Sequence, residues 1–294
     1  MDEKKIQALV ADGVLADRQM IPWRPAAGHE FPSPEAGEVI VFDPFFYRGF
    51  SLPAHPFLKG LLAFYGISLH HLNPSSILHI STFIHLCEAF LGIFPHFNFF
   101  RANFFLKPQP SAANIQNVGG AGLQCRNTKK YFDMSLRTSN KGWHDSWFYC
   151  PNPSYSLGAS AAGFPTPCDS WKAKLTSQEE LEVTPLFEKV AELKNKGLTG
   201  VWIVRHFLQF RLNPLKERVH PVFEYSGPSD PTRESPVNLD DNVLKSRLAD
   251  LFTNDVVIPT AADKLACKAF HIYRTTSKVT SSSPLHLLCM VCFS

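Results

Sequence analysis

The 294-residue sequence predicts a helix-dominated α+β fold with a small antiparallel sheet around residues 115–150. Three observations predict this class. Hydrophobic residues make up 45% and charged residues 19% of the chain, which is the balance of a globular protein with a core. Apolar residues recur at helical spacing in several segments that are bounded by capping residues and glycines. Residues 115–150 instead contain short aromatic runs separated by glycine-rich turns.

The first part of the chain is predicted to combine a helix, a connector and a strand. Residues 1–20 are amphipathic and predict a short helix, and they lack the apolar core of a secretory signal. Residues 21–37 are rich in proline and predict a connector. A strand is predicted from Glu38, and the chain then turns at Gly49 and Pro53.

Two apolar helices are predicted to pack against each other between residues 55 and 92. The first ends near Gly66. The second begins after Asn73, a favourable N-cap residue, with Pro74 at its first helical position. It ends at Gly92.

The second of these helices carries histidines, which raises the question of a metal site. His79 and His85 are six residues apart, whereas metal ligands on one helix face need a spacing of three or four. The apolar run is also of marginal length for a membrane span and contains Glu88. We therefore expect a core helix, in which His85 and Glu88 form a polar pair on the less buried face.

Loops and a long helix are predicted next. The aromatic run at residues 97–106 leads into a loop, and residues 151–170 form another loop rich in proline, serine and glycine. Thr176 and Glu179 match a capping box, which marks the start of a helix. We expect this helix to restart at Pro185, because proline cannot donate the backbone hydrogen bond of a helix interior.

Two further helices are predicted toward the C-terminus. One follows Thr199 and is stopped by Pro214. The other is capped by Asp240 or Asp241 and runs to about Phe252.

Basic residues are concentrated in the middle of the chain. Residues 95–175 contain nine lysines and arginines and three acidic residues, a surplus of six. Residues 1–94 have three more acidic than basic residues, and residues 176–294 are balanced. Only the middle segment has the surplus that would attract an anionic partner.

The basic residues of the middle segment interleave with aromatic residues. Proteins commonly bind single-stranded nucleic acid by placing cationic side chains against its phosphates and aromatic rings against its bases. The same pattern fits a sheet whose aromatic residues fill the core while its lysines are solvated, and both interpretations stay open. The nucleic-acid hypothesis assigns binding to Arg126, Lys129, Lys130, Tyr131, Arg137, Lys141 and Trp143.

The sequence contains no recognisable motif for catalysis, metal binding or nucleotide binding. The segment VGGAG lacks the spacing of phosphate-binding loops and predicts a tight turn. Zinc sites need close ligand pairs, and the CxxC of Cys289 and Cys292 has no second pair after it. We predict no catalytic residue, no metal and no cofactor. A cysteine–histidine nucleophile stays an open alternative, because such residues meet only in space.

Four stretches of the sequence carry a resemblance to a known family. They are residues 45–97, VGGAG, KGWHDSWFY at residues 141–149, and residues 198–233, which begin LTGVWIVRHF. Together they resemble the gypsy-type transposon domain family, which is abundant in plant genomes. The resemblance runs in order from about Glu38 to Phe252.

The resemblance implies an origin in plant gypsy-type retrotransposons and brings no established catalytic residues. The motifs of an aspartic protease, a reverse transcriptase and a zinc knuckle are absent from the sequence, which fits a protein without enzymatic activity. Spacing alone leaves an integrase-like acidic triad open, but no run of the sequence suggests one. We expect an N-terminal helix and connector at residues 1–35, the gypsy-type domain at residues 36–255 and an irregular tail at residues 256–294.

The tail departs from the polar continuation that is usual in the family. We hypothesise that residues 265–294 are a truncated or misread gene end. An uninterrupted transcript that ends at this stop codon would contradict this idea.

Three functional hypotheses follow. The first is a non-catalytic structural or nucleic-acid-associated module, and the second is a protein-interaction domain that binds a partner through an apolar surface. The third is an enzyme of unknown type. No membrane partner is expected, since the apolar stretch of residues 285–293 is too short to span a bilayer. Seven scattered cysteines favour reduced thiols inside a cell, in the nucleus or the cytoplasm.

Overall fold

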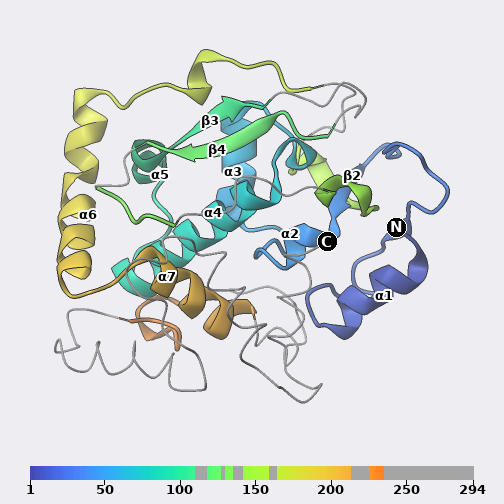
Figure 1. Cartoon of the computed structure of the whole chain (residues 1–294), viewed down its shortest axis with the longest axis horizontal. Coiled ribbons are helices and arrows are strands. Elements are labelled where there is room, and N and C mark those ends of the chain that lie inside the picture. Colours follow the sequence, from blue (N-terminus) through green and yellow to red (C-terminus); the bar gives the residue numbers. More distant parts are fainter. Residues whose placement is uncertain (110–117, 127–129, 135–141, 159–163, 213–224, 235–294) are drawn as a thin grey trace.

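A computed structural model describes residues 1–109, 118–126, 130–134, 142–158, 164–212 and 225–234 of the chain (Figure 1). Among these residues 48% are helical and 12% lie in strands, which confirms the helix-dominated α+β class. The helix predicted from Asp240 or Asp241 and the hypothesis on residues 265–294 fall outside the described residues.

The N-terminal helix packs into the same core as the rest of the described chain. Helix α1 (Glu3–Ala11) is capped by Asp2, whose carboxylate accepts a hydrogen bond from the amide of Lys5. Ile6 and Leu9 of this helix are buried in the main hydrophobic cluster. The connector that follows contributes β1 (Arg24–Pro25) to a sheet.

Two central helices confirm the boundaries that the sequence predicted. Helix α3 (Pro56–Tyr65) ends at Gly66, whose φ of 63° lies in the left-handed region that favours glycine. Helix α4 (Pro74–His85) continues without interruption as the π-helix η2 (Leu86–Leu91) and ends at Gly92, which also has a positive φ.

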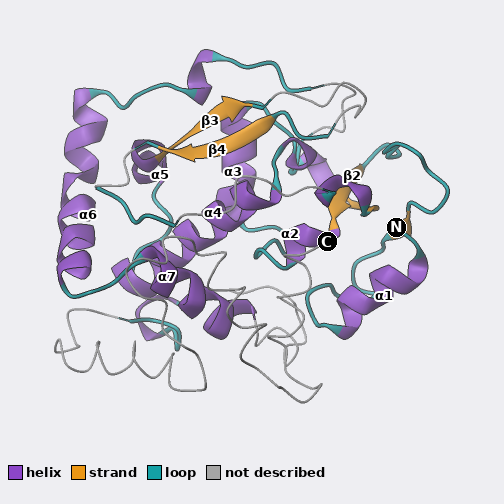
Figure 2. Cartoon of the chain, in the orientation of Figure 1, coloured by secondary structure: helices purple, strands orange, loops and turns teal. Residues whose placement is uncertain are grey.

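Helix α4 lies at the centre of the fold. It contacts helices α2 and α7 and strand β4, and Figure 2 shows helices and strands around it on several sides. Asn73 caps it by accepting a hydrogen bond from the amide of Ser76 at 2.8 Å. The prediction of a core helix is therefore confirmed, and its burial extends around almost the whole circumference.

Two small antiparallel sheets are present among the described residues. One has the strand order β1–β5–β2, with β2 (Glu38–Phe42) paired along its length with β5 (Trp147–Pro151). The other is the hairpin of β3 (Phe104–Pro108) and β4 (Ala121–Cys125). The strands expected at residues 115–150 are thus β4 and β5, but they belong to different sheets and pair with strands outside that range.

The aromatic run before β3 does not lead directly into a loop. Helix α5 (Phe97–Asn103) forms there and passes straight into β3. His96 caps this helix by accepting a hydrogen bond from the amide of Phe99. Phe99 and Phe100 are fully buried, and this burial supplies a reason for helix formation that composition does not show.

Helix α6 (Ser177–Asn195) is continuous, so the predicted restart at Pro185 is wrong. Its capping box joins Thr176 and Glu179 as predicted. Pro185 is exposed, so its ring displaces no packed neighbour. The helix loses one backbone hydrogen bond to the carbonyl of Leu181, which water can replace on an exposed surface.

The remaining elements are short. Helix α7 (Gly200–Phe207) begins after Thr199, as predicted, and continues as the π-helix η6 (Leu208–Leu212). Pro214, the predicted stop, lies outside the described residues. Helix α2 is Asp43–Phe46. Single 3-10 turns are η1 (Leu69–His71), η3 (Trp143–Asp145), η4 (Pro153–Tyr155), η5 (Asp169–Trp171) and η8 (Gly227–Ser229).

Aromatic side chains fill the core and explain the 25 phenylalanines of the sequence. Phe83 of α4 lies at the centre, with ring contacts to Phe57, Phe99 and Phe100 at centroid distances between 5.1 and 5.6 Å. Such stacked, tilted and edge-on pairs add to the free energy gained by burying the rings. The phenylalanine excess therefore belongs mainly to the interior.

Replacing Pro185 with alanine should stabilise the protein, since α6 is continuous there. Alanine restores the missing backbone hydrogen bond and removes the clash of the ring with the preceding turn. We expect the free energy of unfolding in urea to rise by about 1–3 kcal/mol. Glu188→Ala, at another exposed position of α6, should change it by less than about 0.5 kcal/mol. A Pro185→Ala protein no more stable than wild type would contradict this account of the helix.

Candidate functional site

The structure describes four of the seven residues that the sequence assigned to nucleic-acid binding. Lys129, Arg137 and Lys141 lie outside the described residues. Lys130 is exposed, and its Nζ lies 5.7 Å from the ring centroid of Phe187.

The two aromatic residues of that set lie in or against the core. Tyr131 is only 1% exposed and packs edge-on against Phe104. Trp143 is half-buried and stacks on Phe45 at a centroid distance of 5.7 Å. Tyr131 therefore offers no surface on which a base could stack, and Trp143 offers only part of its ring.

Arg126 is held in place by backbone groups. Its guanidinium donates hydrogen bonds to the carbonyl oxygens of Arg101, Phe104 and Ala173. Its Cζ lies 5.2 Å from the ring centroid of Phe105. Arg126 thus joins α5, the β3–β4 hairpin and the segment before α6. The seven-residue binding set stays a prediction.

A second group of polar residues lies where the two π-helices meet. We call it the buried polar cluster, and it comprises His55, His85, Glu88, His206, Arg211 and Glu234. Helices α4 and α7 each end in or next to a histidine and continue as a π-helix that carries one charged member of the cluster. π-Helical segments are rare and often occur at functional sites.

An ion pair between Glu88 and Arg211 lies at the centre of the cluster. The guanidinium Nη1 of Arg211 donates to Oε2 of Glu88, and the two residues are 5% and 1% exposed. Burial lowers the pKa of Arg211, while the carboxylate of Glu88 acts to raise it. Two buried charges are stable only when paired in this way, so the pair fixes η2 against η6.

The predicted polar pair of His85 and Glu88 is therefore wrong. His85 is fully buried, and its Nε2 lies 2.8 Å from Nδ1 of His206. His85 meets α7 instead of solvent. The helical periodicity could not show this, because the partners His206 and Arg211 come from a helix more than a hundred residues later.

The histidines continue the cluster to the segment after η6. Nε2 of His206 lies 3.4 Å from Oε1 of Glu234, and the amide of Glu234 donates to the carbonyl of Ala89. When the Nε2 proton of His206 points to this carboxylate, Nδ1 of His206 accepts a hydrogen bond from Nε2 of His85. Burial, and then the positive charge of Arg211, keep the pKa of His85 well below its ordinary value. His85 is therefore neutral.

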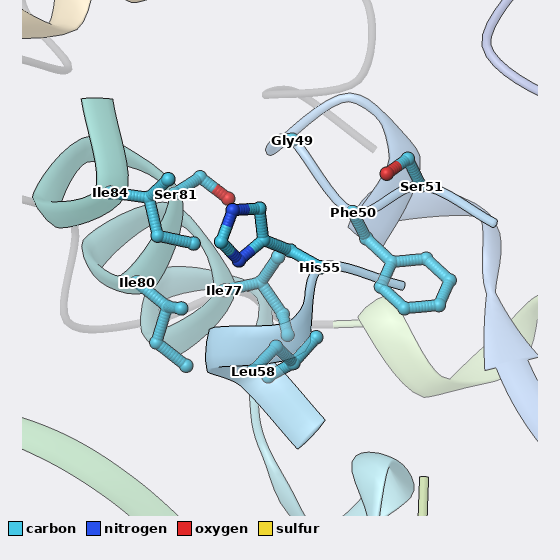
Figure 3. Close-up of a pocket in the computed structure, with 9 residues that line it drawn as sticks. All are labelled: Gly49, Phe50, Ser51, His55, Leu58, Ile77, Ile80, Ser81 and Ile84. Atoms are coloured by element: carbon cyan, nitrogen blue, oxygen red, sulfur yellow. The ribbon is translucent and has the colours of Figure 1, made fainter. Parts of the chain in front are cut away.

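His55 completes the cluster at the edge of a small cavity (Figure 3). The cavity has a volume of about 20 Å³, which is room for one water molecule. It is lined by Gly49, Ser81 and His55, with isoleucines of α4 and Leu58 of α3 around them. Serine, histidine and the nearby Glu88 are the residue types of a catalytic triad.

The hydrogen bonds of His55 do not suit such catalysis. Its Nδ1 accepts a hydrogen bond from the amide of Phe57 and caps α3. The ring proton is therefore on Nε2, which lies 3.4 Å from Oε1 of Glu88. Both nitrogens are thus occupied, and a general base needs one that can take the proton of the nucleophile.

Metal-ligand clusters, disulfides and membrane-spanning helices are absent from the part of the chain that the structure describes. It contains no group of three histidine, cysteine or acidic side chains placed to hold a metal ion. Its four cysteines, Cys87, Cys125, Cys150 and Cys168, form no disulfide. None of its helices has both the length and the apolar character needed to cross a membrane.

One comparison with known proteins gives a match. Residues 39–108 match the family model described as "putative gypsy type transposon". The chain thus contains a gypsy-type, transposon-derived domain. This confirms the resemblance for about a quarter of the chain, and its continuation to Phe252 stays a prediction. No curated protein and no solved structure matches the chain.

The matched segment runs from β2 through β3 and contains half of the buried polar cluster. His55, His85 and Glu88 lie within it, whereas their partners on α7, η6 and the following segment lie beyond it. The matched segment therefore depends on later parts of the chain to neutralise the buried carboxylate of Glu88.

Removing one partner of the buried ion pair should destabilise the protein strongly. Glu88→Gln leaves the guanidinium of Arg211 buried without its counter-charge, and we expect unfolding in urea to show a loss of about 3–5 kcal/mol. Glu88→Gln combined with Arg211→Met should recover much of this loss, because no uncompensated charge remains. Glu182→Gln, at an exposed pair with His96, should cost less than about 1 kcal/mol. Equal effects of Glu88→Gln and Glu182→Gln would refute the role of the pair.

The buried His70 should make the free energy of unfolding depend on pH. It is 1% exposed, and burial, followed by the neighbouring His71, lowers its pKa from 6.5 to about 3. The unfolded chain takes up a proton on this ring below pH 6.5, whereas the folded protein does so only near pH 3. Stability should therefore fall as the pH drops from about 6.5 toward about 3. In urea titrations, the stability of the His70→Leu protein should fall less steeply across this pH window. A pH dependence of stability equal to that of wild type would contradict the lowered pKa of His70.

Proposed function

We propose that this transposon-derived protein is a non-catalytic module that associates with nucleic acid inside the cell, in the nucleus or cytoplasm. A plant retrotransposon origin is part of this proposal. The observation that carries it is the position of the basic residues of the middle segment. Lys107, Lys172 and Lys174 are exposed, and none of them forms an ion pair within the described residues. Their charge is therefore available to an anionic partner.

The absence of catalysis in this proposal is supported by the buried polar cluster. Within it the charges of Glu88 and Arg211 neutralise each other, and the small cavity at its edge accommodates about a single water molecule. Substrate pockets are far larger, in the range of about 300–1,000 Å³. The described residues form a hollow of that size, about 660 Å³, but it is lined by none of the residues of the cluster. The cluster therefore fits a structural role, in which it holds α4, α7 and the segment at Glu234 together.

A second candidate is a protein-interaction domain without nucleic-acid binding. Two large apolar side chains of the described surface favour it, since Phe94 is 75% exposed and Leu181 is 67% exposed. Phe94 lies in the loop before α5, and Leu181 lies on α6, which contacts α5. Single exposed apolar residues are common on soluble proteins, so this observation weighs less than the available charges.

Salt dependence of binding tests the proposed function. The full-length protein should bind a labelled single-stranded oligonucleotide, and the logarithm of its affinity should fall linearly with the logarithm of salt concentration, by about 0.7 per phosphate contact. Replacing Lys129 and Lys130 with glutamine should flatten this slope if the sequence-predicted pair binds phosphates. Fluorescence anisotropy over several salt concentrations gives both values. No binding at low salt would contradict the proposal and favour the protein-interaction domain.

A further inference from the structure

We propose that single-stranded nucleic acid binds to one particular face of the fold, formed by the end of α3, α5, the β3–β4 hairpin and the segment before α6. This inference rests on the proposed function and adds the site. We call it the cation–aromatic face, and it comprises Phe64, Phe97, Arg101, Phe105, Lys107, Arg126, Lys172 and Lys174. Most of these residues lie outside the set that the sequence suggested.

The first part of the face is an aromatic pair covered by an arginine. Phe64 of α3 and Phe97 of α5 have ring centroids 4.8 Å apart in an edge-on arrangement. The Cζ of Arg101 lies 5.3 Å from the ring centroid of Phe64 and 6.0 Å from that of Phe97. Phe64 remains 39% exposed, so part of its ring is open to a stacking base.

The second part of the face is the outer side of the hairpin. Side chains alternate along β3, where Phe104 and Leu106 are buried while Phe105 and Lys107 point outward. The guanidinium of Arg126 lies over Phe105 and thereby sets a cation beside a partly exposed ring.

Arg126 connects the two parts. Its Nε donates to the carbonyl of Arg101, 2.9 Å away, which ties the hairpin to α5. Its Nη2 donates to the carbonyl of Ala173 at 2.8 Å, which places Lys172 and Lys174 on either side of this anchor. Figure 1 shows the segment before α6 passing along the side of β3. Arg126 therefore links the elements that carry the aromatic rings and the exposed lysines.

The cations of the face differ in whether their charge is already paired. Arg101 is paired with Glu179 at 2.7 Å, so its charge is largely neutralised. Arg126 is fixed by three carbonyl oxygens and serves as a scaffold. Lys107, Lys172 and Lys174 are exposed and carry the charge that is available to phosphates. A surface on which cations lie among aromatic rings suits an unpaired strand, whose bases can stack, better than a duplex, whose bases are covered.

The test compares matched pairs of lysines in the full-length protein. Lys172→Gln combined with Lys174→Gln removes two charges from the face, and Lys4→Gln combined with Lys5→Gln removes two exposed charges from α1, away from it. The probes are fluorescent oligothymidylate and oligouridylate of about 15 nucleotides, near the upper end of single-domain sites. We expect the first variant to bind about tenfold or more weakly at moderate salt and its salt slope to flatten by about 1.4. The α1 variant should bind like wild type.

A second matched pair tests stacking. Phe64→Leu keeps an apolar side chain on α3 but removes the aromatic ring, and Phe94→Leu makes the same change at an exposed position outside the face. We expect Phe64→Leu to weaken binding about fivefold or more, because loss of one stacked base has an effect of this order. Phe94→Leu should leave affinity unchanged. Thermal unfolding of all variants should match wild type, which excludes misfolding as the cause.

The outcomes separate the site from the function. If wild type binds neither probe at low salt, both the proposed function and this site fail. If wild type binds but the Lys172 and Lys174 variant behaves like the α1 variant, the site is wrong and the function stands. Equal competition by a duplex, or equal affinities of the two leucine variants, would overturn the single-strand assignment. If only the variants of the face bind more weakly, with either probe, the site is supported. The ratio of the wild-type affinities for the two probes shows whether DNA or RNA is preferred.

Discussion

The buried ion pair of Glu88 and Arg211 is the interaction on which the arrangement of the central helices depends. A carboxylate in the middle of an aromatic core would be strongly unfavourable alone, so η2 can be buried only when η6 supplies the guanidinium. The polar contacts continue from His85 to His206 and from His206 to Glu234. The backbone amide of Glu234 also donates a hydrogen bond to the carbonyl of Ala89. One buried charge thus brings together three segments that are far apart in the sequence.

The π-helical ends of α4 and α7 follow from the same constraint. A π-helix widens the turn and changes the direction in which side chains point, at a cost in backbone hydrogen-bond geometry. Here η2 begins directly after the buried His85 and η6 begins two residues after the buried His206, and each π-helix carries one half of the ion pair. We interpret the π-helices as the backbone adjustment that lets two helices meet through charged side chains in an otherwise apolar interior.

Arginine residues have a different role beside α5. Arg101 and Arg126 lie beside aromatic rings and are held by a carboxylate and by backbone carbonyl oxygens. These contacts fix the hairpin to α5 and to the segment before α6, so that the exposed lysines have defined positions. A sequence of alternating aromatic and basic residues therefore separates, on folding, into rings that fill the core, arginines that join elements and lysines that face solvent.

The sequence by itself determined the class of fold and the ends of its strongest helices, since the signals for these are local. Asn73 with Pro74, the glycines at positions 66 and 92 and the capping box at Thr176 act through neighbouring residues only. The tertiary structure alone decided which strands pair, that α5 forms, and that Tyr131 is buried. It also decided that His85 and Glu88 bind residues of α7 and η6 instead of each other. Such partners lie many residues away, and the cost of burying a charge or the gain from burying a ring is set only when the distant segments meet.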